Sequence, residues 1–486
     1  MLMVATLLAL TMALAAAIND RPELWRGPPD EYGHRSAARY YVDHWLPPKV
    51  GDAATLDSYS PDYGFSYLND TDPVYFLAGK FAALISPIVP SHDVAFRLFN
   101  VTLLGMLAGL CRLRPKAWLV FAPLLLSPQI WYIFSYFNGD AFPLFLSVLI
   151  AYQVAEPGSR FNKYLDTPGV LRNFSGALLL GVLVALLELS KKNYLSFLAL
   201  VPAVIALARL GAPSSILLAS SAIASAAWYL DWFSMGIAEV RVLAAGALLA
   251  VSGSIYLAPS TRRARGAIVA KFAAMGIVAL AVVVPRFASD MVIHGSLEER
   301  RVAMGVVQEE LAKPAYKPSQ IYWGKPEDTY YGIGLRARGT PLRELFAPAW
   351  SWHTMTFVSA TGQYGWLEYS ARKPYYVMIA AGYLALLAVY AWAVVRSRDV
   401  AARLTFLLVS AFAALSVAAA IHQSWVNDFQ AQGRYLFPIA AMLGIGLQAV
   451  RNKMEPRVVT GVVACCFALS VWSFTFIGLW HIPKSF

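Results

Sequence analysis

Residues 375–395 read YYVMIAAGYLALLAVYAWAVV, and the stretches that follow read RSRDVAAR at 396–403 and LTFLLVSAFAALSVAAAI at 404–421. The first and last of these stretches contain no charged residue, whereas the one between them contains three arginines and one aspartate. A helix needs about 20 mainly apolar residues to cross the roughly 30 Å hydrocarbon core of a bilayer. These residues therefore predict two membrane-spanning helices joined by a short basic loop.

Apolar runs of similar length recur along the whole chain of 486 residues, of which 58% are hydrophobic and 14% charged. In soluble globular domains about a quarter of the residues are charged. We therefore predict an all-α polytopic protein of the cell inner or plasma membrane, built as one module over residues 1–486. The predicted spans lie near 2–18, 95–111, 117–136, 141–155, 175–189, 194–210, 214–233, 240–258, 267–285, 375–395, 404–421, 436–450 and 458–480.

The basic residues indicate which ends of these spans face the cytoplasm. With a cytoplasmic N-terminus, the inner loops and their flanks hold 17 basic and four acidic residues, and the rest of the chain holds 23 basic and 25 acidic. Loops on the cytoplasmic side carry an excess of Lys and Arg. Topology therefore explains the net charge of +11, and we expect no nucleic-acid partner. The three cysteines lie in or beside apolar runs, which excludes a disulfide or zinc framework.

Two long segments, 19–94 and 286–374, fall on the predicted outer side. The first contains two helix candidates, 31–45 and 73–90, which we expect to lie along the membrane surface. The second is rich in Tyr, Trp, Pro and Gly, which predicts a small irregular lid facing the substrate. Residues 1–19 also end in small residues, as a cleaved signal peptide does. Cleavage would leave twelve spans and keep the first segment outside.

A pair of carboxylates follows the first span in the sequence RGPPDEYGH at 26–34. Capping of a helix start by Asp30, with Glu31 in the first turn, is the structural interpretation of this pair. The functional interpretation is that a carboxylate at the membrane surface takes a proton from an acceptor. His34 follows one helical turn later, but two candidate ligands are too few for a metal site, so we expect no metal and no other cofactor.

Three further polar clusters lie at predicted outer ends of spans. In FNGD at 137–140, Asn138 and Asp140 fit either a tight turn or a contact with the acceptor. Lys191 and Lys192 fit either snorkelling to headgroups or binding of a phosphate. Arg434, in QAQGRYLFP at 430–438, needs an anionic partner at the edge of a span, which Glu188, Asp428 or a lipid phosphate could supply.

Taken in order, four motifs resemble the bacterial membrane family called domain of unknown function 2142. They are Pro-Pro-Asp-Glu-x-x-His at 28–34, Asn-x-Asp at 138–140, Ser-Lys-x-x-Tyr at 190–194 and Gln-Gly-Arg-Tyr-x-x-Pro at 432–438. The resemblance runs from about residue 24 to about residue 440. That family is similar to the GT-C glycosyltransferases and distantly to the protein mannosyltransferases and the lipid A aminoarabinose transferases. The Tyr-Gly between Glu31 and His34 departs from the Pro-Ala expected of the family.

The resemblance implies a GT-C fold of 11 to 13 spans, with two interfacial helices in the first outer loop and a polyprenyl-phosphate sugar as the donor. It implies that Asp30 is the catalytic base with Glu31 beside it, and that Arg434 and either Lys191 or Lys192 hold the donor phosphate. The remaining polar residues are expected to contact the acceptor or to support those that do: His34, Asn138, Asp140, Gln432 and Tyr435.

The expected activity is transfer of a sugar, with inversion, to a glycan, lipid or protein acceptor on the periplasmic or extracellular face of the membrane. One alternative is an O-antigen polymerase or ligase, which would concentrate arginines in a large outer loop. The segment 286–374 does contain Arg300, Arg301, Arg336, Arg338 and Arg343. The other alternative is a transporter or flippase of lipid-linked saccharides, but such proteins often show internal repeats, and none is visible here.

Overall fold

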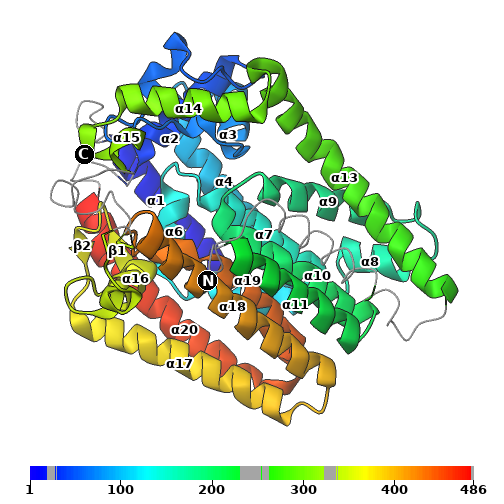
Figure 1. Cartoon of the computed structure of the whole chain (residues 1–486). Helices are drawn as coiled ribbons and strands as arrows, with labels where there is room; N and C mark the ends of the chain where they lie inside the picture. Colours follow the sequence, from blue (N-terminus) through cyan, green and yellow to red (C-terminus); the bar gives the residue numbers. More distant parts are fainter. Residues whose placement is uncertain are drawn as a thin grey trace.

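The computed structural model describes residues 1–18, 28, 30–229, 253, 262–321, 335, 336 and 338–482. Nearly all of its regular structure is helical (Figure 1), and one short antiparallel sheet pairs Gln363 with Ser370. The predicted all-α polytopic class is confirmed. In chain order, the α-helices of the first half are α1 (Leu2–Ile18), α2 (Glu31–Asp43), α3 (Val74–Ile85), α4 (His92–Leu113), α5 (Trp118–Phe121), α6 (Pro128–Ser135), α7 (Ala141–Ala155), α8 (Arg160–Asp166), α9 (Ser175–Glu188), α10 (Leu195–Arg209) and α11 (Ala212–Tyr229). The rest are α13 (Arg262–His294), α14 (Leu297–Leu311), α15 (Pro318–Ile321), α16 (Trp352–Gly362), β1 (Gln363–Tyr364), β2 (Tyr369–Ser370), α17 (Lys373–Arg396), α18 (Val400–Val426), α19 (Pro438–Ala449) and α20 (Pro456–Ser473).

Seven of the described helices are long and apolar enough to cross a membrane, and a bent pair would make an eighth. Each of the seven coincides with a predicted span, and these spans are His92–Leu113, Ala141–Asp166, Lys192–Arg209, Gly266–His294, Lys373–Arg396, Val400–Val426 and Pro456–Leu479. Shorter helices occupy four other predicted spans: 2–18, 175–189, 214–233 and 436–450. The predicted span 240–258 lies almost wholly outside the described residues. The total of 13 therefore stays a prediction.

The predicted span 117–136 is not a straight helix. Two helical segments, Pro115–Leu125 and Pro128–Ser135, meet there at 87°. Proline disfavours a helical conformation in the residue before it and donates no backbone hydrogen bond, and Pro128 stands at this break. The hydroxyl of Ser127 accepts a hydrogen bond from the N–H of Gln129 and so caps the second segment. An apolar run of membrane length thus becomes a sharp bend.

Helix α6, which is the second segment of this bend, and helix α7, which follows it, are buried inside the molecule. Every residue of α6 is buried, and so are most residues of α7. The amide of Asn138, in the turn between them, donates to the carbonyls of Ile133 and Tyr136 and accepts from the N–H groups of Asp140 and Ala141. The turn interpretation of Asn138 is confirmed, and the hydrogen bonds of its side chain connect the end of α6 to the start of α7.

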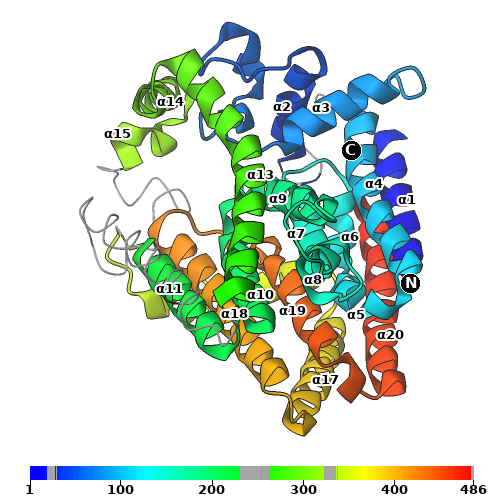
Figure 2. The same cartoon turned by 90° about the vertical axis from the view of Figure 1, so that its right-hand side faces the viewer.

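Elements of the first and second predicted outer segments cover one end of the bundle. Both helix candidates of the first segment are helices, α2 and α3, and Figure 2 shows α3 running across the ends of α1 and α4. Gly79 permits this packing, because a Cβ atom there would lie 2.7 Å from the carbonyl oxygen of Ala38. The second segment is more helical than the expected irregular lid. Helix α13 continues to His294, and α14 follows it after two residues.

Candidate active site

A cavity of about 870 Å³ opens at this covered end, a volume within the usual range for ligand pockets. Its described wall comes from six parts of the chain: the start of α2, the loop before α3, the segment between α9 and α10, the end of α14, the β1–β2 hairpin and the segment before α19. Asp30, His34, Lys191, Arg434 and Tyr435 all line it, which brings three of the four predicted motifs to one place. Their arrangement decides what each side chain can do.

Asp30 stands directly before α2, but its side chain makes no capping hydrogen bond, so the capping interpretation is wrong for the side chain. Its backbone has φ 61° and ψ 4°, a left-handed conformation that Asp and Asn adopt more readily than most residues. The carboxylate is 33% exposed and lines the cavity, and its Oδ2 lies 3.3 Å from Nη2 of Arg434. Asp30 therefore keeps a carboxylate that a molecule in the cavity can reach.

Glu31, the next residue, has a different environment. Both of its carboxylate oxygens accept hydrogen bonds of 2.8 Å from Arg97 of α4, and Oε1 also accepts from the N–H of Phe137. Glu31 is 2% exposed. Burial by itself would raise the pKa of Glu31, but Arg97 outweighs it and holds that pKa below its ordinary value. This geometry favours a positioning role, in which Glu31 ties the start of α2 to α4 and to the turn before α7.

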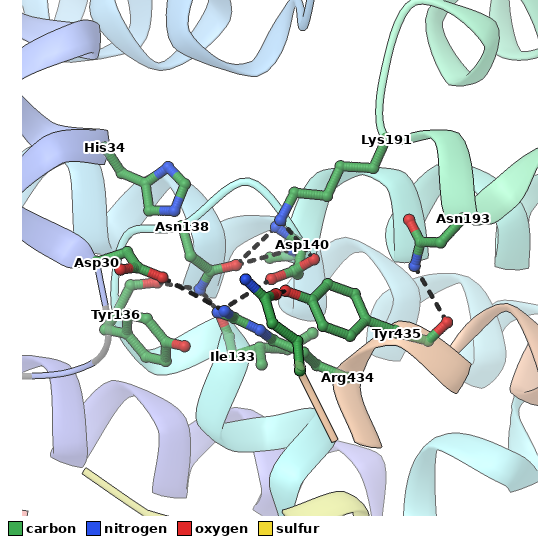
Figure 3. A network of polar contacts seen from close by, with 12 residues as sticks. Asp30, His34, Ile133, Tyr136, Asn138, Asp140, Lys191, Asn193, Arg434 and Tyr435 are labelled. Carbon is green, nitrogen blue, oxygen red and sulfur yellow. Dashed lines mark hydrogen bonds and ion pairs between the residues drawn. The ribbon is translucent and has the colours of Figure 1, made fainter. Parts of the chain in front are cut away.

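Asp140 links the two predicted phosphate-binding cations (Figure 3). Its Oδ1 lies 2.7 Å from Nζ of Lys191, and its Oδ2 lies 3.6 Å from Nη1 of Arg434. The groups thus alternate in sign from Asp30 through Arg434 and Asp140 to Lys191, and all of them except Asp140 line the cavity. Burial would raise the pKa of Asp140, but the two cations hold it below its ordinary value. Asp140 is 1% exposed, so it is a counter-charge that fixes both cations and not a group open to an acceptor.

The structure separates the two adjacent lysines. Lys191 lines the cavity and pairs with Asp140, whereas Lys192 is exposed and is not among the cavity residues. A short 3-10 helix begins at Lys192, and Lys191 is the residue directly before it. Lys191 is therefore the lysine that lies with Arg434. Of the anionic partners expected for Arg434, neither Glu188 nor Asp428 forms a described ion pair with it, and Asp30 and Asp140 take that place.

His34 lines the cavity beside Asp30 (Figure 3) and is held by two tyrosines. Its Nδ1 lies 2.8 Å from the hydroxyl of Tyr75, and its ring stacks on Tyr67 with centroids 3.9 Å apart. Burial, with Lys191 and Arg434, lowers the pKa of His34 well below 6.5, so the ring is neutral at physiological pH. Among the described residues no group of three His, Cys, Asp or Glu could hold a metal ion.

The remaining predicted contacts, Gln432 and Tyr435, also line the cavity. The hydroxyl of Tyr435 donates to Oε1 of Gln430, a residue that was not predicted.

The polymerase or ligase alternative rested on five arginines of the segment 286–374. Arg300, for example, pairs with Asp290 and donates to the carbonyl of Asn69, and none of the five is among the cavity residues that the structure describes.

Sequence reasoning missed two groups that shape the site. The first is Arg97, which lies inside an apolar helix. A single arginine there needs an anionic partner, and that signal could have pointed to Glu31.

The second is Asp72, in the Asp-Thr-Asp triplet at 70–72 before a proline. Burial raises the pKa of Asp72 to about 7, although the N–H of Val74 and Lys191 oppose this shift. A β-carbon at Gly139 would lie 3.4 Å from Asp72 and 3.1 Å from Lys191, so the carboxyl belongs to the same cluster.

Comparison of the chain with protein-family models, with curated proteins and with solved structures finds no match in any of the three. The functional interpretation therefore rests on the residues of this cavity and their geometry.

Proposed function

We propose that this protein is an inverting membrane glycosyltransferase of the GT-C type, which moves a sugar from a polyprenyl-phosphate donor to a hydroxyl group of an acceptor. One observation carries the proposal. At one end of the bundle an accessible carboxylate, Asp30, pairs with Arg434, and a single buried counter-charge, Asp140, holds Arg434 together with a second cation, Lys191. This set provides a base and a phosphate-binding pair in one cavity.

The charges define how the reaction would proceed. The Asp30 carboxylate takes the proton of an acceptor hydroxyl, and the oxygen forms a bond to the anomeric carbon of the donor sugar. The bond between that carbon and the phosphate oxygen breaks on the opposite face, and its electron pair leaves with the polyprenyl phosphate. Inversion at the anomeric carbon follows from this geometry.

Lys191 and Arg434 would stabilise the charge that collects on the departing phosphate. Arg supplies a planar fork of donors, and Lys supplies a compact charge that follows a phosphate oxygen. A phosphate leaving group needs no general acid, so the neutral ring of His34 is not required to donate a proton. His34 would instead orient the acceptor hydroxyl beside Asp30.

Location at the end of the bundle suits substrates of this kind. A polyprenyl-phosphate sugar keeps its tail in the membrane and presents its phosphate at the surface. A cavity walled by the start of α2 and the end of α14, elements that cover one end of a bundle of apolar helices, suits such a molecule. The charge distribution in the sequence supports the periplasmic or extracellular face.

The decisive experiment is reconstitution. The purified chain in lipid nanodiscs would be given polyprenyl-phosphate sugars with radiolabelled hexose or pentose, and a total glycan, lipid and protein extract of a strain lacking the gene as acceptor. Transfer of label that depends on the chain, with inversion at the anomeric carbon, is expected. Transfer from a nucleotide sugar instead, or no transfer from any lipid-linked donor, would contradict the proposal.

A further inference from the structure

The composition of the cavity wall is unlike that of the rest of the chain. Seven of its described residues are aromatic: Tyr32, Tyr59, Tyr63, Phe65, Tyr67, Trp366 and Tyr435. No Ala, Val, Leu, Ile or Met is among the described residues of this wall, although the chain is 58% hydrophobic. The other residues are mainly carboxylates, amides, hydroxyls and cations. Aromatic rings combined with polar groups fit a molecule that has both C–H faces and hydroxyl edges.

Two of the most exposed rings sit on rigid turns. Tyr63, 42% exposed, lies in a tight turn in which the N–H of Gly64 donates to the carbonyl of Ser60. Gly64 has φ +59°, and a Cβ atom there would lie 2.7 Å from the backbone nitrogen of Ala312. The N–H of Lys313 also donates to the carbonyl of Asp62. The turn is therefore fixed against the end of α14. The ring of Tyr63 packs on Tyr316 with centroids 4.6 Å apart and stays partly exposed, so a ligand would meet it in a preset position.

Trp366, 48% exposed, is presented from another part of the chain, at the tip of the β1–β2 hairpin. The N–H of Gly365 donates to the hydroxyl of Tyr132, and the side-chain amide of Gln363 donates to the carbonyl of Leu367. Gly365 has φ +64°, which suits the sharp turn. These bonds hold the hairpin tip against the buried α6, so Trp366 also stands on a rigid support.

Polar groups that fit hydroxyls complete this part of the wall. Asp428 accepts a hydrogen bond of 2.7 Å from Nε2 of Gln430, and this amide pairs with the hydroxyl of Tyr435. The charges nearest the outside cancel, because Asp62 and Lys313 form an ion pair with each other. An uncharged, hydroxyl-rich ligand matches this part of the cavity better than an anion or a lipid tail does.

We propose that the outer part of the cavity, between Trp366, Tyr63 and Asp428, is a subsite for an uncharged saccharide chain, and that this chain is the acceptor. The inference rests on the proposed function and narrows its acceptor from glycan, lipid or protein to glycan. The C–H face of a sugar ring would lie against Trp366 or Tyr63, and its hydroxyls would bond Asp428 and Gln430. The next sugar inward would then bring its hydroxyl to Asp30.

Binding of soluble saccharides without any donor tests this subsite by itself. The full chain in nanodiscs would be mixed with uncharged hexasaccharides of glucose, mannose, galactose and arabinose, in α and β linkage, and with hexapeptides rich in Ser and Thr. Saturation-transfer NMR detects binding, and titration calorimetry gives the Kd. We expect at least one saccharide to bind. Trp366→Ala should weaken it about tenfold, and Tyr63→Ala about fivefold, the scale of a lost aromatic contact.

Controls separate this proposal from the chemistry and from folding. Trp392→Ala removes a tryptophan that is 62% exposed on α17, away from the cavity residues, and should leave the Kd unchanged. Asp30→Asn should also bind saccharide normally while losing transfer, so failure of the subsite and failure of the proposed function remain distinguishable. Trp366→Phe should recover part of the affinity if stacking is the cause.

Three outcomes would overturn the subsite: no hexasaccharide binds, the saccharides bind equally well after Trp366→Ala and Tyr63→Ala, or the peptides bind and lose affinity in the same variants. The last outcome would identify a protein acceptor. Melting temperatures of the variants, measured in the same nanodiscs, show whether a loss comes from unfolding.

Discussion

Both ends of the helix bundle bury charged side chains, but the two ends use them differently. At the end opposite the cavity, Nζ of Lys271 donates to the carbonyls of Tyr164, Leu165 and Thr167, which end α8. Glu156, after α7, accepts from Gln448 and Arg451. These charges complete the hydrogen bonds of helix ends. Their function is to join helices.

At the cavity end the charged groups keep unused hydrogen-bonding capacity. Nε of Arg434 and Oδ2 of Asp140 have no hydrogen-bond partner among the described residues, although both are buried. Leaving such an atom unsatisfied costs about 1–3 kcal/mol, so an anionic ligand that accepts a hydrogen bond from Nε of Arg434, a cavity residue, is favoured. Both ends bury charged side chains. The candidate active site is distinguished by a buried charged group that lines a cavity and has an atom without a hydrogen-bond partner among the described residues, Nε of Arg434.

The largest effect expected from this difference is on turnover. Asp30→Asn should lower the rate of sugar transfer about a thousandfold, because an amide cannot take up the acceptor proton. Asn also tolerates the left-handed backbone, Asp30 makes no capping bond, and Asp140 still neutralises Arg434, so the melting temperature should change little. The matched change at the opposite end, Glu156→Gln, should lower the melting temperature and leave the rate per folded molecule unchanged. Equal loss of activity in both variants would remove the distinction between the two ends.

Next in size is the loss of stability expected when a buried ion pair is broken. Glu31→Gln leaves Arg97 without its counter-charge and should lower the free energy of unfolding by about 3 kcal/mol. Chemical denaturation in detergent measures this change. If Glu31→Gln were as stable as the wild type yet inactive, Glu31 would be a catalytic residue, and the positioning role would be wrong.

Donor affinity should depend on the two cavity cations. Lys191→Ala and Arg434→Ala should each weaken binding of a polyprenyl-phosphate sugar by about 1.5–3 kcal/mol, the scale of a charge-assisted hydrogen bond. The double variant should lose less than the sum, because both cations are coupled through Asp140. Lys192→Ala is the control and should bind normally. Strict additivity, or an equal loss in Lys192→Ala, would mean that the lysines only reach for lipid headgroups.

At the opposite end the buried Lys271 should matter for stability alone. Lys271→Met keeps an unbranched apolar side chain but removes three hydrogen bonds to carbonyls, which should lower the free energy of unfolding by about 1–2 kcal/mol. The donor Kd should stay the same. A weaker donor affinity in Lys271→Met would show that the two ends of the bundle are energetically coupled.

The smallest expected effect is a dependence of donor binding on pH. Asp72 has a pKa raised to about 7, so it is neutral below pH 7 and negative above it, where it faces Lys191, Asp70 and Asp140. The added charge repels a phosphate, and donor affinity should fall about threefold between pH 6 and pH 8, as a partly screened repulsion would give. Asp72→Asn should bind equally at both pH values. A steeper dependence that survives in Asp72→Asn would assign the titration to another group.

Periodicity and charge in the sequence predicted the helices of the membrane body well, because a long apolar run with basic flanks has few stable arrangements in a bilayer. All seven long spans of the described chain coincide with predicted ones. The failure came at 117–136, where the bend at Pro128 turns the chain by 87°. Hydrophobicity measures whether a residue prefers lipid or a protein core to water, and a fully buried helix such as α6 has the same composition as a span.

The sequence by itself also selected Asp30, Lys191 and Arg434 as candidates, since charged residues next to apolar runs are costly unless they have partners. The resemblance implied Asp30 as the base with Glu31 beside it, but it left open which of Lys191 and Lys192 faces the donor, because neighbours in a chain share the same local signal. Tertiary structure shows how the two members of each pair differ. Arg97, 66 positions from Glu31, occupies one carboxylate and leaves the other open, and Asp140 fixes one lysine while its neighbour faces outward. Partners of this kind are set by packing between distant helices, which no local pattern of residues records.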